Sequence, residues 1–428
     1  MLAPILASRS KGRRDRQAQR PEIVIQRGQY DFPTLRLWHD SLSMRVLALV
    51  GTVYTDIAED RNRIVIGIDR QNASVGRSNV QRTLARLGVP PGMVDLVETV
   101  GFVIDRKRAT CNPCAPGSTD TGRQSAAAFS GTTLYALVSG AHTSGHGPSM
   151  NATSNIEIGS RAGLRSAATY SVSTLSDRLR PLEGGIEIDY YRQSDNTYWG
   201  CSLGFLAYRN QQAVFVTASH CSSVFGAPDG TGYYQPTVEV GNYAGAETAD
   251  PAYTTAQTCD DPDQPGTSRP CRDSDALAAL LATDVTWSLG KIAKPTGTGT
   301  FSYTDSGPTT IDAAQPHLTI IAKGNYPNIN MILDKIGRST GWTYGYVAQT
   351  CVNLRASEPS QGLIVVLRCQ DLVEATAQGG DSGAPVFQWG DTGVTLYGVV
   401  SARRLNGQGL SMSAMSNIEF DLGTLTVF

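Results

Sequence analysis

The sequence is poor in charge and contains no long apolar stretch. Charged residues make up 17% of the 428 residues, against about 25% in typical soluble domains. The formal net charge is only −2, so no strong field would gather a polyanion, and nucleic-acid binding is not expected. The longest apolar runs, such as 46–50 and 277–282, are far shorter than the roughly 18 residues that a membrane span needs. A membrane-spanning protein is therefore not expected either.

The cysteines indicate an oxidising compartment. The chain has eight of them, an even number, and an even count with low charge is typical of exported, disulfide-bonded proteins. The N-terminus is not arranged as a signal peptide, because the short apolar stretch 1–7 precedes the basic residues instead of following them. We expect a secreted, extracellular protein on the evidence of the cysteines alone.

Composition divides the chain into four parts. Residues 1–21 are basic and aperiodic, as in a flexible tail. Residues 22–110 mix strand-like and helix-like patterns. Residues 111–180 are dominated by Ser, Thr, Gly and Ala, as in a linker. Residues 181–428 consist of short β-rich runs separated by turn residues, which predicts an all-β domain long enough for two barrels.

The second part is predicted to be a small α/β domain. The runs 45–54 and 63–68 read as strands joined by a polar turn. Ser78 is expected to cap a helix that carries Val80 and Leu84 at helical spacing, and Gly88 ends it. The run 94–103 then returns to strand.

Two short segments carry the residue types of nucleophilic catalysis. In GGDSGAP (379–385), glycines on both sides of Ser382 permit a tight turn that exposes its hydroxyl and aims backbone N–H groups at one place. In AVFVTASHC (213–221), a buried strand ends in His220, beside Cys221. A histidine at a strand end is held rigidly and still faces a cleft.

These segments resemble the two signature segments of chymotrypsin-fold serine endopeptidases. TASHC (217–221) and GDSGAP (380–385) stand in the family's order, and CSLGF (201–205) is similar to the streptogrisin-like bacterial branch. The resemblance covers about residues 184–428 and implies two antiparallel six-stranded β-barrels, trypsin-like. Ala384 departs from the glycine usual in the family. Residues 22–110 resemble the pro-domains that precede some secreted bacterial serine proteases.

Chain order is consistent with this resemblance. An α/β-hydrolase needs a histidine after its nucleophile, but the last histidine, His317, precedes Ser382. A subtilisin arrangement needs a helix after the serine, whereas Pro385 and an alternating strand follow it here. The order that remains is histidine, acid, serine.

The acid must then lie between residues 221 and 381. Asp275 is favoured because it stands at the head of an apolar run, where the family places its buried aspartate. Asp273 and Asp284 remain alternatives. The implied catalytic residues are His220, Asp275 and Ser382, with the backbone N–H groups of Gly380 and Ser382 as an oxyanion hole.

The resemblance also locates a substrate pocket. Its base lies near Thr376 and its wall at Val400, Ser401 and Ala402. Since no carboxylate occupies the base, we expect an uncharged, apolar or aromatic side chain on the acyl side of the cut. The sequence leaves open whether Asp381 pairs with a newly freed N-terminus, because the stretch 184–186 only loosely resembles such a start.

The family disulfide corresponds to Cys201 with Cys221. The remaining cysteines are expected to pair as Cys259 with Cys271, Cys351 with Cys369, and Cys111 with Cys114. The last two, with His142 and His146, also mimic four zinc ligands, but their gap exceeds the usual finger spacing. The acidic loop 260–263 is read as solvated and not as a calcium site. No metal and no cofactor are expected.

The sequence therefore predicts a secreted serine endopeptidase made as a zymogen. Its partners are expected to be a polypeptide substrate and its own pro-domain, acting as intramolecular inhibitor or chaperone, in a monomer that matures near residues 180–185. Two alternatives remain: a catalytically silent, protease-like binding module, and a protease that processes only itself.

Overall fold

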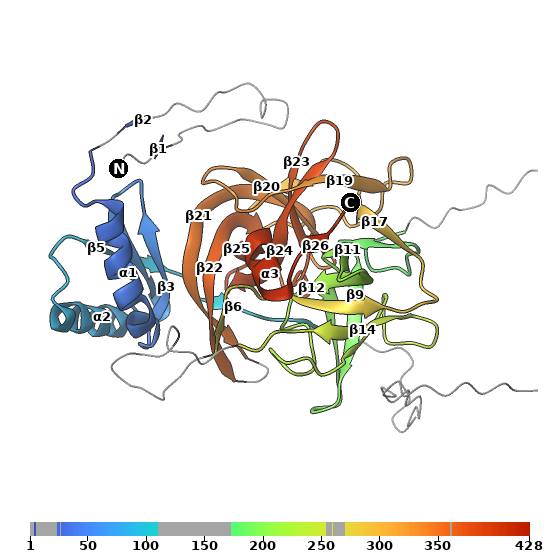
Figure 1. The fold of residues 1–428 in the computed structure, drawn as a ribbon, viewed down its shortest axis with the longest axis horizontal. Helices are drawn as coiled ribbons and strands as arrows, with labels where there is room; N and C mark the ends of the chain where they lie inside the picture. Colours follow the sequence, from blue (N-terminus) through green and yellow to red (C-terminus); the bar gives the residue numbers. More distant parts are fainter. Residues whose placement is uncertain are drawn as a thin grey trace, which may run out of the picture. The chain divides into compact units, whose positions relative to one another are not determined.

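The computed structural model describes residues 27–109, 173–253, 259, 270–359 and 362–428, together with the short backbone pairing of β1 (Pro4–Ile5) and β2 (Val24–Ile25). Apart from β1, the expected tail lies outside the described residues. The expected pairing or zinc site at Cys111, Cys114, His142 and His146 and most of the expected linker lie outside them as well. Figure 1 traces the chain from the N-terminal α/β unit (residues 27–109) to the β-rich remainder.

The N-terminal α/β unit places two helices against a small sheet (Figure 1). Strand β3 pairs antiparallel with β4, and β4 pairs parallel with β5. The elements of this unit are α1 (Phe32–Leu47), β3 (Thr52–Ala58), β4 (Arg63–Asp69), the 3₁₀ turn η2 (Arg70–Asn72), α2 (Ala73–Leu87) and β5 (Val94–Thr99).

Helix α1 corrects the sequence analysis, which expected a strand from residue 45. Asp31 caps this helix by accepting the N–H of Thr34, and the helix continues to Leu47 before β3 begins at Thr52. The buried face of α1 includes His39 and Ser43, whose side chains hydrogen-bond to Thr55 of β3 at 3.1 and 2.6 Å. Polar residues on the buried face hide the helical period that apolar residues would have shown.

Helix α2 confirms one expected end and corrects the other. Gly88 ends the helix in the left-handed conformation with φ +68°, as expected of a C-terminal glycine. The helix begins at Ala73 and not near Ser78, because Asp69 caps the preceding 3₁₀ turn and leads the chain directly into it.

The first barrel is a closed ring of six antiparallel strands. Strands β10 and β11 are two arms of one strand that bends at Leu203 and Gly204. Pairing then runs from β11 through β12, β16, β14, β13 and β9 back to β10. The strands are β9 (Glu187–Arg192), β10 (Thr197–Ser202), β11 (Phe205–Arg209), β12 (Gln212–Thr217), β13 (Gly232–Tyr234), β14 (Tyr243–Ala249) and β16 (Leu277–Leu281).

The second barrel is also a closed ring of six antiparallel strands. Its pairing runs β20, β21, β22, β25, β24, β23 and back to β20, and every pairing is antiparallel. The strands are β20 (Ile332–Gly337), β21 (Gly341–Glu358), β22 (Leu363–Thr376), β23 (Pro385–Trp389), β24 (Val394–Arg404) and β25 (Gln408–Ala414). The expected fold, two antiparallel six-stranded barrels, is confirmed.

Short elements complete the described structure. Ser173 to Arg180, which the sequence analysis assigned to the linker, contribute the buried Leu175 to the core of the first barrel. These elements are β6 (Phe102–Val103), β7 (Lys107–Arg108), β8 (Leu182–Gly184), β15 (Cys271–Arg272), β17 (Trp287–Ala293), β18 (Thr300–Phe301), β19 (His317–Lys323), α3 (Met415–Leu422) and β26 (Leu425–Thr426). None of the helices in the described residues is long and apolar enough to cross a membrane.

A long hairpin of the second barrel joins it to the N-terminal α/β unit. Strand β21 pairs antiparallel with β3, with Asn353 opposite Thr55 and Leu354 opposite Tyr54. Side chains reinforce the pairing: Asn353 donates to Ser43 Oγ at 2.9 Å, and Gln349 donates to Asp56 Oδ2 at 2.8 Å. The sheet of the unit is thereby continued into the barrel.

Asp56 makes this junction sensitive to pH. Burial raises the pKa of Asp56 to about 6, although the Gln349 hydrogen bond and His39 oppose the shift and Glu59 supports it. A carboxyl whose native pKa is raised stabilises the native state least when it is ionised. The penalty is absent below the ordinary pKa of 3.8, grows as pH rises from there to about 6, and is constant at higher pH.

The variant Asp56→Asn is expected to be more stable than the wild type at pH 7 and nearly equal to it at pH 4. The raised pKa corresponds to a cost of about 3 kcal/mol at most when the group is ionised. Urea unfolding at the two pH values measures this difference, with the exposed Asp60→Asn as control. Equal gains at both pH values would contradict the assignment.

Candidate active site

His220 and Asp275 form a buried pair inside the molecule. His220 follows β12 and Asp275 precedes β16, and these two strands are neighbours in the first barrel. The ring Nδ1 of His220 lies 2.5 Å from Asp275 Oδ2, and the backbone N–H of His220 donates to Oδ1 at 3.1 Å. Both side chains are fully buried. A carboxylate at Nδ1 orients the ring and leaves Nε2 as the proton acceptor.

Further contacts fix Asp275 as an ionised carboxylate. Its backbone N–H donates to Ser413 Oγ at 2.9 Å, and the Tyr253 hydroxyl donates to its Oδ1 at 3.2 Å. Burial alone would raise the pKa of Asp275. The charge and hydrogen bonds of His220, together with the Arg272 guanidinium, outweigh burial and lower the pKa below its ordinary value.

The two alternative aspartates lie elsewhere. Asp273 forms a partly exposed ion pair with Arg368 at 2.7 Å, and Asp284 is an exposed residue of the turn after β16. Neither has a contact with His220 in the described part of the chain.

Ser382 stands in a turn that only glycine on both sides permits. Gly380 has φ +97° and Gly383 has φ +80°. A Cβ at Gly383 would lie 2.1 Å from Thr217 Oγ1, at the end of the strand that leads to His220. The Ser382 carbonyl accepts the N–H of Ser202 at 2.9 Å, so the first barrel holds this turn of the second barrel.

In this turn, only every second backbone N–H group donates to a backbone carbonyl oxygen. Those of Asp381 and Gly383 donate to Gln378 O and Val400 O, both at 2.9 Å. Within the described residues, the N–H groups of Gly380 and Ser382 have no backbone acceptor. Two N–H groups without a backbone acceptor, beside the Ser382 hydroxyl, are the geometry that an oxyanion needs.

The sequence left open whether Asp381 pairs with a newly freed N-terminus, and in this structure it pairs with a lysine. Its carboxylate lies 3.2 Å from Lys335 Nζ and accepts hydrogen bonds from Thr340 Oγ1 at 2.6 Å and the N–H groups of Ser339 and Thr340. Burial lowers the pKa of Lys335, and Asp381 opposes the shift. In this structure the turn is held by an internal lysine, without a chain terminus.

The variant Lys335→Met is expected to cost about 3–5 kcal/mol of stability. It would leave the fully buried carboxylate of Asp381 without its counter-charge. Urea unfolding measures the loss, with the surface variant Lys291→Met as control. Adding Asp381→Asn should recover part of the loss. A change below about 1 kcal/mol in Lys335→Met would show that the pair does not hold the turn.

Residues 102–108 run through the site as an extended segment, here called the cleft segment. On one side of Ser382, β6 pairs antiparallel with β24, with Val103 opposite Arg403. On the other side, β7 pairs antiparallel with β10, with Lys107 opposite Gly200. One stretch of the N-terminal unit is thus held by main-chain pairing to both barrels.

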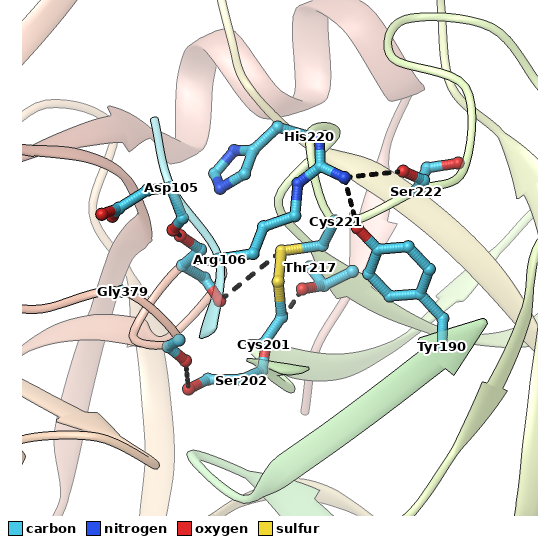
Figure 2. The surroundings of a disulfide bond; sticks show 12 residues. Asp105, Arg106, Tyr190, Cys201, Ser202, Thr217, His220, Cys221, Ser222 and Gly379 are labelled. Atoms are coloured by element: carbon cyan, nitrogen blue, oxygen red, sulfur yellow. Dashed lines mark hydrogen bonds between the residues drawn. A yellow bond between two sulfur atoms is a disulfide. The ribbon is translucent and has the colours of Figure 1, made fainter. Parts of the chain in front are cut away.

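The middle of the cleft segment contacts the candidate nucleophile. The Ser382 hydroxyl donates to the carbonyl oxygen of Asp105 at 2.9 Å. Among the described residues, Nε2 of His220 has no hydrogen-bond partner. Figure 2 shows the Asp105–Arg106 backbone beside the His220 ring, close to the Gly379 turn.

The side chains of Asp105 and Arg106 enter charged surroundings. The Asp105 carboxylate forms a two-point ion pair with Arg403, with Nε at 2.9 Å from Oδ1. The Arg106 guanidinium lies 3.1 Å from Glu358 Oε1 and donates to the Tyr190 hydroxyl at 2.7 Å and to the Ser222 carbonyl (Figure 2).

The expected pocket residues lie on two strands of the second barrel, β22 and β24, which have β25 between them. Thr376 is buried at the end of β22 and donates to Ser302 O at 2.7 Å. Val400, Ser401 and Ala402 lie in β24, directly before Arg403, and Ser401 Oγ lies 3.0 Å from Gln370 Oε1. Glu374, the nearby carboxylate, faces Arg404 at 3.4 Å.

Three of the expected disulfides are confirmed. They join Cys201 to Cys221, Cys259 to Cys271 and Cys351 to Cys369. The first lies beside the cleft segment (Figure 2). The described residues contain no group of three His, Cys, Asp or Glu side chains arranged to hold a metal ion.

Three residues of the site were missed by the sequence analysis. Lys335 carries no local signal. Arg403 could have been noticed, because a charged pair, Arg403 with Arg404, directly extends the expected pocket wall. The position of Asp105 was not predictable, since 277 residues separate it from Ser382.

Comparison with known proteins gives similarity in structure only. No family model matches the chain, and no curated protein matches it. Similar solved structures include a Nocardiopsis protease, with 18% identity over 57% of this chain and 98% of that one at a TM-score of 0.35. Thermobifida fusca protease A has 16% identity over 57% and 97%, at a TM-score of 0.36.

A glutamic acid specific serine protease that uses a histidine triad in substrate binding is similar as well. Its identity is 17%, over 58% of this chain and 100% of that one, at a TM-score of 0.38. At such identities and TM-scores, the likenesses carry no conclusion about chemistry, and the function must be argued from the contacts of the chain itself.

Proposed function

We propose that this protein is a secreted serine endopeptidase made as a zymogen. His220, Asp275 and Ser382 are its catalytic residues, and the N–H groups of Gly380 and Ser382 form its oxyanion hole. The proposal is supported chiefly by one observation: an extended peptide lies across the His220–Asp275 pair, with its Asp105 carbonyl bonded to the Ser382 hydroxyl.

The proposed reaction is acyl transfer to serine and then to water. Ser382 Oγ attacks the peptide carbonyl carbon while Nε2 of His220 takes the hydroxyl proton. The proton then passes to the leaving amine as the C–N bond breaks, which leaves an ester on Ser382. Water, deprotonated by the same histidine, hydrolyses the ester. Asp275 holds the ring and stabilises the imidazolium, and each oxyanion donor supplies about 2.7–4 kcal/mol.

In the same proposal, residues 27–109 are the pro-domain, and the cleft segment is its inhibitory part. Any other polypeptide must displace the cleft segment to reach Ser382. The β3–β21 pairing holds the pro-domain to the second barrel and supports a role as intramolecular inhibitor or chaperone. Three disulfides support export. The substrate is a polypeptide, and the protein acts as a monomer without a cofactor.

The proposal is tested by incubating the purified full chain with an unfolded protein such as β-casein and identifying fragments by mass spectrometry. The wild type should cut the casein, and Ser382→Ala should not. Cuts confined to the chain itself would indicate the alternative of a self-processing protein. An intact chain, intact casein and no reaction with a fluorophosphonate would indicate the catalytically silent module.

A further inference from the structure

We propose that the cleft segment is bound as a substrate, with Asp105–Arg106 as the bond presented to Ser382, and that the enzyme prefers an acidic residue before the cut and a basic residue after it. The inference rests on the proposed function and specifies its substrate. It differs from the expectation of an uncharged acyl-side residue, which considered only the base and wall of the pocket.

The register of the cleft segment identifies the bond. The carbonyl oxygen that accepts the Ser382 hydroxyl belongs to Asp105. This oxygen is not bonded to the N–H groups of Gly380 and Ser382 in this structure, so hydrolysis requires it to turn into the oxyanion hole. Upstream, Val103 and Phe102 pair with Arg403 and Arg404 of β24, and downstream, Lys107 and Arg108 pair with β10. The residues before the bond therefore lie against β24 and those after it lie against β10, so the two sides have different surroundings.

On the acyl side, the Arg403 guanidinium binds the side-chain carboxylate of Asp105. Its guanidinium meets Asp105 with two nitrogens on two oxygens, the geometry that Arg and carboxylate share. The two side chains are only 21% and 26% exposed, so water screens the pair incompletely. The neighbouring Arg404 faces Glu374 instead, which leaves Arg403 as the cation of this subsite.

On the leaving side, Arg106 contacts one carboxylate and two aromatic rings, and the Arg192 guanidinium also lies over the Trp199 ring, 5.0 Å from its centre. Arg106 and Glu358 are each 1% exposed, and the Arg106 guanidinium also lies over the rings of Tyr190 and Trp199, at 6.0 and 5.7 Å from the ring centres. An acidic side chain at this position would place a second negative charge beside the buried Glu358 carboxylate.

A second buried carboxyl group, that of Asp189, lies near the cleft segment. Gly200 of β10 pairs with Lys107 on one side and with Asp189 of β9 on the other. Asp189 is buried, and its Oδ1 has no hydrogen-bond partner among the described residues. Burial raises the pKa of Asp189 to about 8, so this group is neutral near pH 7. The ionised partners beside the bond are therefore Arg403 before it and Glu358 after it, which complements the order Asp-Arg of residues 105 and 106.

The test compares hydrolysis of peptides that copy residues 100–110. One peptide has the native sequence, a second has Lys in place of the aspartate, and a third has Glu in place of the first arginine. All are given to a chain carrying Arg106→Glu, which weakens the hold of its own cleft segment. The native peptide should be cut between Asp and Arg, with kcat/KM about 10- to 100-fold above that of either altered peptide.

Variants of Arg403 test the recognition directly. Arg403→Gln should bring the aspartate and lysine peptides to similar kcat/KM, and Arg403→Glu should reverse their order. The matched variant Arg404→Glu should leave the ratio unchanged, because Arg404 does not contact Asp105. Restored cutting of the lysine peptide by Arg403→Glu also shows that this variant folds.

The outcomes separate this inference from the proposed function. Cutting that depends on Ser382 but falls after uncharged residues, or a ratio that Arg403→Glu does not alter, overturns the inference and leaves the peptidase standing. If no peptide is cut and no fluorophosphonate reacts, the proposed function and the inference both fail.

Discussion

Replacing Ser382 by alanine is expected to lower kcat/KM for peptide hydrolysis by about 10⁶-fold, the scale found when a catalytic serine or histidine is removed. His220→Ala should have a similar effect, because the serine is a weak nucleophile without a base to take its proton. The two losses should not multiply in the double variant, since the residues act as one unit. Initial rates with a fluorogenic peptide measure the change.

Asp275→Asn provides the finer test of the same claim. The amide keeps the size of the carboxylate, but it no longer stabilises the imidazolium and favours the wrong ring tautomer, so a loss of about 10⁴-fold is expected. Asp273→Asn is the matched control, because Asp273 forms a partly exposed ion pair with Arg368 instead of a pair with His220. If Asp273→Asn lost more activity than Asp275→Asn, the assignment of the acid would be wrong.

Replacing Arg106 by glutamate is expected to release the active site from the cleft segment. In the wild type the Arg106 guanidinium is buried against Glu358 and the Tyr190 hydroxyl. A glutamate there would place two carboxylates together, and breaking such a buried pair costs about 3–5 kcal/mol. The rate at which the uncut chain hydrolyses an added peptide should rise about 10²- to 10³-fold.

The control for this prediction is Arg108→Glu. Arg108 belongs to the same cleft segment but is exposed, so the same change of charge should raise the rate little. Equal rates in wild type and Arg106→Glu would mean that Arg106 does not hold the cleft segment in place. The double variant Arg106→Glu with Glu358→Lys should return the rate toward that of the wild type, because it restores an ion pair of opposite direction.

Local patterns predicted the parts of the site that depend on local backbone geometry. The glycines around Ser382 and the strand that ends at His220 are signals of this kind. The short β-rich runs predicted an all-β domain, whereas the two six-stranded barrels were implied by the resemblance to chymotrypsin-fold endopeptidases. Helix α1 was missed because His39 and Ser43 occupy its buried face, where their bonds to Thr55 depend on a strand not yet placed.

The charged contacts of the cleft segment could not be predicted from local sequence patterns either, because their partners are also far apart in the sequence. Asp105, Arg403 and Glu358 acquire their roles only when the N-terminal α/β unit and the second barrel come together. Lys335 likewise meets Asp381 across 46 residues of sequence. Ion pairs between residues far apart in the sequence produce no periodic pattern or fixed spacing from which they could be predicted.

The most direct test of the central claim is to locate the adduct of a fluorophosphonate probe by peptide mass spectrometry, using the Arg106→Glu chain. One phosphonyl group should be found per chain, on Ser382. The same chain with His220→Ala should react far more slowly. A probe that labels another residue, or that labels Ser382 equally fast without His220, would contradict a serine nucleophile activated by this histidine.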